Sequence, residues 1–532
     1  MRGSMSRHRP SLASLALLVA VAGSASAAQA QAANGAQILA SATATLRIND
    51  PFWLDRELSS YANTAGAKDG QLRNAVAQFL YGTRGLSGID LQRPAILAWR
   101  EGASPLVAII PIAAGQRPQF MKDFGAVGLG PPMVQMGQRD GTTIFSQVGE
   151  KVNNEYRVLV QNDTAYVART PGECAALAAM PLAAINELHP KLVFEASGTF
   201  LTGNAAGVEL PLPDLDGAAA QAGVAAASYA LAAMPALIEQ VQSVSWALGP
   251  GQVEDSWLIS ARAVARMGTP LAQWMANQRN QASRLLPALT SDHTVMTVHG
   301  GISWQGELER LGVDLAAEMG PRLGAQRWNE AVEKAWNEQW TILDEQGSFA
   351  AAFDLVPAAG GHPARTISRF ACEQPRGAEL AALEQSIASA LAEPGQVAVA
   401  PSEVVVGDRA GQQRALPGET RSAVRVATES HVIEVQSDQA DVPALAAETL
   451  GRIQQAGRPD GTPGLVVVRI DLTRIVRSFL PDDDIPDPVL DEVAFEFACK
   501  TGVQGSVGLE MELPLGRISV LLRDSLLLHQ NE

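Results

Sequence analysis

The sequence is poor in cysteine and lysine, and it has no long apolar run after its first thirty residues. Its 532 residues include only three cysteines, which excludes the disulfide-rich class of small secreted folds. Later apolar runs are shorter than the ~18 residues that a membrane-spanning helix needs, so we predict no membrane span. Lys and Arg total 40 against 56 Asp and Glu, a net charge of −16. This balance argues against nucleic acid or an anionic membrane as a partner, because both favour a basic surface patch.

The usual catalytic motifs are missing as well. There is no G-x-S-x-G serine-hydrolase motif and no H-E-x-x-H metal motif, and none of the lysines follows a serine at the S-x-x-K spacing. A nucleophile and its base do not need to be neighbours in sequence, so an enzyme with scattered catalytic groups stays an alternative. The sequence assigns no catalytic, cofactor-binding or metal-ligating residue, and it predicts no cofactor.

The three cysteines leave one pairing question open. Cys372 and Cys499 end the similar segments Arg369–Cys372 and Glu496–Cys499, whereas Cys174 stands near a predicted helix start. Either Cys372 and Cys499 form one disulfide, or both are small buried residues in separate strands. Spacing alone does not decide between these alternatives.

Two features were considered as metal sites. His293 and His299 are six residues apart in a predicted strand, which separates them by about 20 Å at ~3.3 Å per residue. They cannot bind one ion at that distance, so we predict structural or surface roles for both. The acidic run at 481–488 has the carboxylates that Ca²⁺ prefers, but it lacks the glycine of an EF-hand loop. A solvated loop is the favoured interpretation of this run.

The N-terminus has the pattern of a secretory signal peptide. Arg2, Arg7 and Arg9 precede the apolar stretch Ser11–Gly23, and small residues with Ala-x-Ala spacing follow up to Ala30. We therefore predict that residues 1–30 are cleaved and that the mature protein is soluble and periplasmic or secreted. No cysteine lies near the cleavage sites, so we expect no lipid anchor. Cleavage removes three arginines and no acid, which changes the net charge from −16 to −19.

Two apolar runs predict the centre of a β-sheet. Pro94–Trp99 and Pro105–Ile112 flank a polar loop at 100–104. Nearly continuous apolar residues are typical of strands that are buried on both faces. We therefore predict that these runs form a hairpin in the middle of an antiparallel sheet, with helices packed over it.

The rest of the chain alternates between blocks of strands and blocks of helices. Tight turns between neighbouring strands, such as Asn162-Asp163, indicate hairpins, and the block order predicts an α+β fold with antiparallel sheets and packed helices. A helical region that is interrupted or restarted at Pro235 is predicted at 218–246, and a final hairpin is predicted at 507–522. After the signal peptide we predict three domains, at residues 31–185, 186–345 and 346–532.

Short segments of the chain also echo one another. Gly88–Leu91 is similar to Gly312–Leu315, and Ile89–Arg93 is similar to Ile470–Arg474. Repeated modules are one interpretation of these echoes. Chance matches in a chain rich in Ala and Leu are the other.

The segment Gly88–Leu91 is also the start of a longer, recognisable order of sequence segments. The segment GIDLQRPAILAW, residues 88–99, leads into an apolar strand that ends at Pro111 and then into the helix RPQFMKDFGAVG. This succession resembles that of large exported bacterial proteins of unknown function, mainly over residues 50–175. The resemblance implies export and α+β modules, and it brings no catalytic motif.

Three tryptophans on one predicted helix are the most distinctive side chains. Trp328, Trp336 and Trp340 recur with Val332 in the segment 327–343, and at ~100° per residue they share one face. Such a face either packs against the rest of the protein or binds a sugar, lipid or peptide. Packing, in its simplest form onto a sheet, is the favoured interpretation.

These patterns favour an exported protein that binds a ligand or has a structural role in the cell envelope, and they favour it over an enzyme. Two alternatives stay open: a periplasmic hydrolase without local motifs, and a carrier or sensor of a hydrophobic ligand that uses the tryptophan helix. A cleft with convergent carboxylates would favour the hydrolase, and an apolar groove would favour the carrier. The sequence does not identify the partner.

Overall fold

A computed structural model describes most of the chain after its first 34 residues. The described residues are 35–64, 86, 88–100, 107–124, 133–147, 155–180, 190–205, 235–253, 255–324, 328–357, 364–391, 401–415, 421–438, 441–479, 493–502, 505–518 and 520. By their contacts they divide into two units. Unit 1 is Met1–Ala196 with Ala247–Gly249, and unit 2 is Ser197–Trp246 with Pro250–Glu532. The signal-peptide pattern and the acidic run at 481–488 lie outside the described residues.

Both units are antiparallel sheets with packed helices, so the predicted α+β class is confirmed. In the described part of the chain, no helix has the length and apolarity needed to cross a membrane. Grouping by contacts does not show which parts fold independently. The three-domain division, with boundaries at 185/186 and 345/346, therefore stays a prediction.

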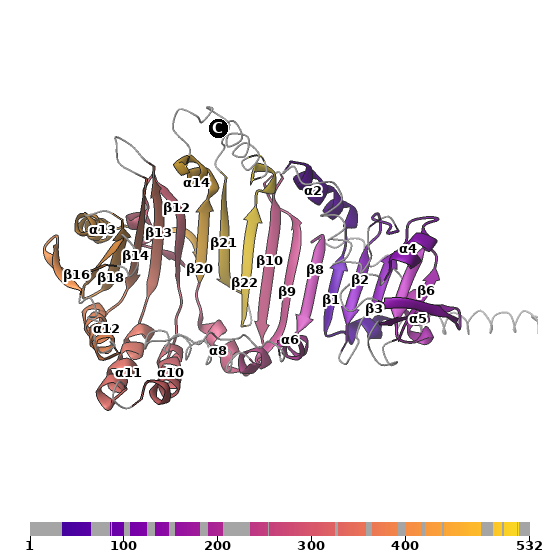
Figure 1. The fold of residues 1–532 in the computed structure, drawn as a ribbon, viewed down its shortest axis with the longest axis horizontal. Helices are drawn as coiled ribbons and strands as arrows, with labels where there is room; N and C mark the ends of the chain where they lie inside the picture. Colours follow the sequence, from indigo (N-terminus) through magenta and orange to yellow (C-terminus); the bar gives the residue numbers. More distant parts are fainter. Residues whose placement is uncertain are drawn as a thin grey trace, which may run out of the picture. The chain divides into compact units, whose positions relative to one another are not determined.

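Unit 1 contains an antiparallel sheet with the strand order β4-β5-β6-β7-β3-β2-β1-β8 (Figure 1). The strands are β1 (Ala44–Ile48), β2 (Ala95–Trp99), β3 (Val107–Pro111), β4 (Met133–Arg139), β5 (Thr142–Gln147), β6 (Glu155–Gln161), β7 (Thr164–Ala168) and β8 (Leu192–Ser197). The helices are α2 (Pro51–Thr64), α4 (Arg117–Asp123) and α5 (Pro171–Ala178). A further helical turn, residues 35–40, precedes β1.

The predicted apolar hairpin is the centre of this sheet. β2 and β3 pair with each other and lie between β1 and β7, and all of their residues except Trp99 are buried. Burial on both faces explains why their apolar residues are continuous rather than alternating. The second predicted hairpin is confirmed too. Asn162 and Asp163 both have positive φ, 49° and 50°, which is the backbone of the tight turn between β6 and β7.

Unit 2 contains an antiparallel sheet with the order β9-β10-β22-β21-β20-β12-β13-β14-β18-β17-β16-β15. The strands are β9 (Val241–Pro250), β10 (Trp257–Ala265), β12 (Thr294–Gly301), β13 (Ser348–Val356), β14 (Arg365–Glu373), β15 (Ser402–Val406), β16 (Arg409–Ala415), β17 (Ser422–Ala427), β18 (His431–Ser437), β20 (Val466–Asp471), β21 (Ala494–Thr501) and β22 (Ser506–Leu513). A separate pair is β11 (Gln281–Ser283) with β19 (Asp460–Gly464).

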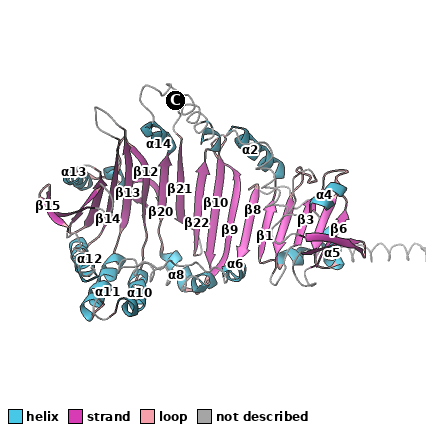
Figure 2. Ribbon diagram, viewed as in Figure 1, coloured by secondary structure: helices cyan, strands magenta, loops and turns pink. Residues whose placement is uncertain are grey.

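The helices of unit 2 gather near the ends and over one face of its strands. Figure 2 shows α8, α10, α11 and α12 at one end of the strands and α14 at the other. Over β13, β14, β17 and β18, helices α9 and α13 pack on alanines and valines to form a hydrophobic core cluster. The helices are α6 (Gly198–Ala205), α8 (Pro270–Asn277), α9 (Leu286–Leu289), α10 (Glu307–Leu323), α11 (Glu330–Asp344), α12 (Gly377–Leu391), α13 (Val442–Gln455) and α14 (Leu472–Phe479).

The same order of elements occurs twice along the chain. Among the described elements, the first copy is β1-α2-β2-β3-α4-β4-β5-β6-β7-α5-β8-α6, and the second is β12-α10-α11-β13-β14-α12-β15-β16-β17-β18-α13-β19-β20-α14. The pairing repeats as well. The order β4-β5-β6-β7-β3-β2-β1-β8 is matched by β15-β16-β17-β18-β14-β13-β12-β20. Agreement in both chain order and pairing supports the interpretation of repeated modules.

The sequence echoes do not coincide with this repeat. Gly88–Leu91 precedes β2, whereas Gly312–Leu315 lies within α10. Ile89–Arg93 also precedes β2, whereas Ile470–Arg474 covers the end of β20 and the start of α14. Neither pair occupies equivalent positions in the two copies. The repeat is therefore visible in the topology and not in those short segments.

Two predictions of secondary structure were wrong. The final hairpin at 507–522 does not form, because β22 pairs with β21 and β10, and residues 515–518 are helical. The helix at 218–246 does not reach its predicted end, because β9 begins at Val241 and pairs with β10. Residues 218–234 lie outside the described residues. In both cases a partner strand that is distant in sequence overrides the local pattern.

Candidate functional site

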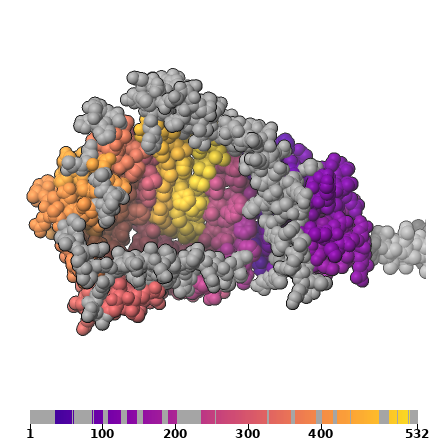
Figure 3. Space-filling view, viewed as in Figure 1, coloured from indigo at the N-terminus to yellow at the C-terminus, as the bar shows by residue number. Residues whose placement is uncertain are grey.

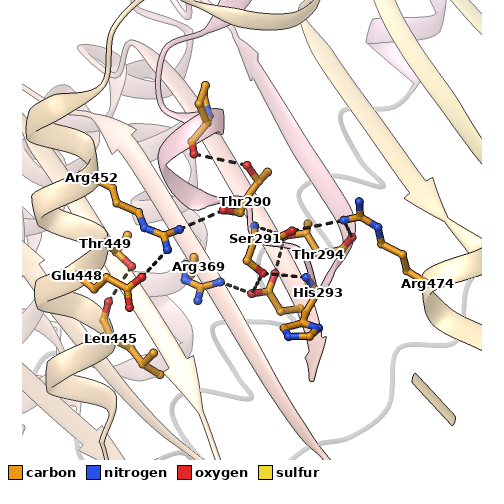
Figure 4. A network of polar contacts seen from close by, with 12 residues as sticks. Thr290, Ser291, His293, Thr294, Arg369, Leu445, Glu448, Thr449, Arg452 and Arg474 are labelled. Carbon is orange, nitrogen blue, oxygen red and sulfur yellow. Dashed lines mark hydrogen bonds and ion pairs between the residues drawn. The ribbon is translucent and has the colours of Figure 1, made fainter. Parts of the chain in front are cut away.

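A buried ion pair is the centre of a polar network at the start of β12 (Figure 4). Arg369 of β14 donates to Asp354 of β13, and the two side chains are only 7% and 1% exposed. Ser291 Oγ and Thr294 Oγ1 donate to the two oxygens of the same carboxylate at 2.8 and 2.7 Å. The carboxylate thus accepts three hydrogen bonds, and a buried ion pair needs such additional partners to be stable.

The turn at 290–294, between α9 and β12, is ordered by its own hydroxyl groups. Ser291 Oγ accepts from the N–H of His293 at 3.2 Å, and Thr294 Oγ1 accepts from the N–H of Ser291 at 2.7 Å. Side chains of this type commonly stabilise turns in this way. His293 therefore lies in an exposed turn and not in the strand that was predicted to contain both histidines.

Arginines from two helices also hold this turn. Arg474 of α14 bonds Asp471 Oδ2 through Nε at 3.1 Å and donates to the carbonyl oxygens of Ser291 and Thr294 at 3.4 and 3.1 Å. Arg452 of α13 donates to the carbonyl of Thr290 at 3.1 Å. With Arg369, three guanidinium groups from three elements fix the turn, as Figure 4 shows. The turn at 290–294 is therefore held in one conformation, and we call this turn and its arginines the wall.

A cavity of about 520 Å³ lies beside this wall. Residues of β12, β20 and β21 line it, together with β19 and the start of α9. Its polar lining is Thr290, Ser291, Thr294, Thr297, His299, Asp460, Thr462, Arg469, Asp471, Arg474 and Glu496. Most hydrogen-bonding groups of the turn are already engaged, so a bound molecule would be met mainly by the side chains from the strands.

His299 is the most buried side chain of this lining, at 2% exposure. Its Nε2 lies 3.1 Å from the carbonyl oxygen of Thr462, and because a carbonyl only accepts, Nε2 carries the proton. Nδ1 is then an acceptor in the neutral ring, and no hydrogen-bond partner for it exists among the described residues. Gly461, with φ +88°, packs against the ring where a Cβ would lie 3.0 Å from Nε2.

The cysteines do not supply a nucleophile. The disulfide between Cys372 and Cys499, which the sequence left undecided, does not form. Register pairs lead from Cys372 to Phe349, Gly300, Val466 and Cys499 in turn. Four strand spacings of ~4.8 Å separate the two cysteines by about 19 Å, beyond the ~7 Å limit for a disulfide. Burial raises the pKa of the Cys372 thiol to about 11, and the same holds for Cys174. Such thiols stay protonated near neutral pH.

The face formed by Trp328, Trp336 and Trp340, which we call the tryptophan stripe, packs inside unit 2. Packing was the favoured prediction, but the stripe packs against helices instead of a sheet. Trp336 Nε1 donates to the carbonyl of Gly312 in α10 at 2.8 Å. Its ring centroid lies 5.5 Å from that of Trp328 and 5.7 Å from that of Trp340. The indole of Trp340 leaves no room for a Cβ at Gly312, which explains the glycine there. Leu391 at the end of α12 completes this cluster.

The polar network was not found from the sequence, although a signal existed. Buried positions alternate along β13 as Ser348, Ala350, Ala352 and Asp354, so the pattern places Asp354 on the covered face. A carboxylate there requires a buried partner. Among the described residues, no group of three or more His, Cys, Asp and Glu side chains is arranged to hold a metal ion. No family model, curated protein or solved structure matches the chain.

Proposed function

We propose that the chain is an exported, non-catalytic binding protein whose ligand occupies the cavity beside the turn at 290–294. One observation carries the proposal. A rigid wall, built by three arginines, borders a cavity whose strand side chains have free acceptor groups. The volume of about 520 Å³ lies within the ~300–1,000 Å³ of small-molecule sites. The signal-peptide pattern at 1–30 supports export.

Binding accounts for these groups better than hydrolysis does. Asp354 is saturated by Arg369 and two hydroxyls, and Asp471 is engaged by Arg474. A general acid or base needs a group that can exchange a proton with its substrate. Glu496 is the one lining carboxylate in the described chain for which no hydrogen bond or ion pair is found. A single free carboxylate supports recognition of a ligand, whereas hydrolases generally use two groups or a metal.

A thermal-shift screen of small polar compounds tests the proposal. We expect at least one compound to raise the melting temperature of the purified protein, because a ligand that binds only the folded state stabilises it. The isosteric variant Thr297→Val and the variant Asp460→Asn should reduce this shift. A shift that both variants leave intact would place the ligand elsewhere. Conversion of the compound during the assay would favour the hydrolase.

A hydrophobic carrier is the second candidate, supported by the opposite face of β12. A hollow of about 350 Å³ there is lined by Met296, Val298, Phe353 and Phe370 among others, and Met296 and Phe370 are each 36% exposed. In the register of the sheet, apolar residues continue from Val298 across β20, β21 and β22. Figure 3 shows side chains of β21 and β22, in yellow, at the surface. Binding of a hydrophobic dye that Phe370→Glu abolishes would favour this candidate.

A further inference from the structure

The cavity continues into a second hollow on the same face of the sheet. The second hollow has a volume of about 370 Å³, is lined by β10, β21 and β22, and shares Glu496 with the first. Thr297 pairs with Arg469, Arg469 with Glu496, and Glu496 with Glu512, so these four side chains form one row across neighbouring strands. Directly opposite residues point to the same face. We call the two hollows and this row the polar groove.

The length of the polar groove follows from strand spacing. It crosses five neighbouring strands, from β12 through β20, β21 and β22 to β10. Four spacings of ~4.8 Å give a length of about 19 Å. An extended peptide advances ~3.3 Å per residue, so about six residues fit along it. A single amino acid or monosaccharide would fill only part of this length.

The charged side chains that line the polar groove leave a small acidic excess. Each hollow is lined by three carboxylates and two basic side chains. The first has Asp460, Asp471 and Glu496 with Arg469 and Arg474, and the second has Glu496, Glu510 and Glu512 with Lys500 and Arg517. Asp471 is paired with Arg474, and Glu510 with Lys500 at 3.4 Å. Because Glu496 lines both hollows, the polar groove as a whole has five carboxylates and four basic side chains, an acidic excess of one.

The free hydrogen-bonding groups agree with the charge. Glu496 and His299 Nδ1 have no partner among the described residues, and Asp460 accepts only from the N–H of Gly461, at 2.8 Å. The two carboxylates are acceptors, so a ligand that pairs with them must supply donors, as ammonium and guanidinium groups do. His299 strengthens the argument because its buried Nδ1 loses a hydrogen bond unless something reaches it.

We infer that the polar groove binds an extended, basic peptide segment of about six residues. The inference rests on the proposed function, which it narrows to one class of ligand. A glycan is the main competitor for a groove of this length. Sugars are commonly held by stacking on aromatic rings, and Phe495 is the single aromatic residue that the described chain contributes to the lining of either hollow.

Fluorescence anisotropy with labelled hexapeptides tests the inference on the purified protein. We expect a peptide of alternating Ala and Arg to bind and a matched peptide of alternating Ala and Glu not to bind. Binding should weaken as salt rises, because exposed charges are screened. Glu496→Gln should lower the affinity about tenfold or more, the usual effect of removing a charged hydrogen bond. Glu195→Gln, on β8 in unit 1, is the matched control and should leave the affinity unchanged.

The possible outcomes distinguish failure of the peptide inference from failure of the proposed binding function. Equal binding of both peptides, or an affinity that Glu496→Gln does not change in a folded variant, overturns the peptide inference. If no peptide binds but a small polar compound or a neutral oligosaccharide does, with loss of binding in Asp460→Asn, the binding function holds and the peptide class is wrong. If no ligand of any class depends on Glu496 or Asp460, both proposals fail.

Discussion

The two copies of the repeated topology differ in the size of the side chains on their central strands and in the burial of the helix that precedes the first strand. In the first copy one buried cross-strand pair of β2 and β3 is Ile96–Ile109, and in the second one buried pair of β13 and β14 is Ala350–Ala371. The helix before the first strand is more deeply buried in the second copy than in the first. Ile38, in residues 35–40, is half-buried, whereas Leu289 of α9 is completely buried.

This exchange shows how one topology acquires a site. Small residues on β13 and β14 let α9 sink into the core, and the turn that follows α9 comes down onto the sheet with it. There Asp354 and Arg369 bind the turn, and the cavity opens beside it. In the first copy, the pair Ile96–Ile109 places larger side chains on β2 and β3. Side-chain size, and not the order of strands, therefore distinguishes a core from a binding site here.

The largest test of the comparison puts a charge into the first copy's core. Leu97→Asp or Ile109→Asp buries a carboxylate without a partner, which costs several kcal/mol against a total stability of ~5–15 kcal/mol. We expect neither variant to yield folded protein, as judged by circular dichroism. Phe370→Asp, at a 36% exposed position of β14, is the control and should fold. Normal melting curves for both core variants would show that the first sheet also tolerates charge.

The second test removes the charge pair that only the second copy has at this position. Asp354→Ala leaves the buried Arg369 without its partner, and we expect a loss of about 3–5 kcal/mol in urea unfolding. Replacing both residues, Asp354→Leu with Arg369→Met, should recover most of that loss, because no uncompensated charge remains. A double variant as unstable as the single one would mean that the hydroxyl groups of the turn matter more than the charge.

The third test concerns the helices that follow the first strand of the second copy. Trp336→Ala should cost about 3 kcal/mol, at the low end for a buried tryptophan, because the side chain is partly exposed and loses its bond to Gly312. Trp336→Phe keeps much of the volume and should cost less. Tryptophan fluorescence should show indoles protected from aqueous quenchers. Full stability with freely quenched indoles would instead make this helix a binding surface.

The smallest effects are expected from the cysteines, of which each copy has one, Cys174 in the first and Cys372 in the second, while Cys499 lies in β21. Their thiols should react slowly with a thiol reagent at pH 8, and a reductant should not change the melting temperature, since no disulfide exists to be broken. Because burial raises the pKa of Cys174 and Cys372 from 9.0 to about 11, unfolded chains ionise first. The free energy of unfolding should therefore fall as pH rises from about 9 to about 11. A flat profile would mean that these thiols are accessible.

The sequence predicted elements whose signals are local. The burial pattern of β2 and β3 and the tight turn at Asn162-Asp163 are confirmed because each depends on neighbouring residues. The partner of β22 was wrong because β10, some 250 residues earlier, competes with the local hairpin. Short-range patterns do not contain such pairings.

The candidate site was not predictable by motif for the same reason. Asp354 and Arg369 lie on adjacent strands, whereas the groups that complete the network come from a turn some sixty residues earlier and a helix about a hundred residues later. No fixed spacing connects them. Only the inward position of Asp354 in the alternation of β13 marked it, as a polar residue among alanines. The tryptophan stripe was easier, because the helical period alone fixes its direction.

The position of the last strand controls when unit 2 is complete. β20 lies beside β12, and β22 lies beside β10, so the middle of this sheet is made from its first and its last strands. A ribosome that has finished β12 must still add about 170 residues before β20 exists. Until β20 and β22 have been synthesised, β12 lacks its partner β20 and β10 lacks its partner β22. Such late pairing makes the addition of the final strands the step that completes the sheet of unit 2.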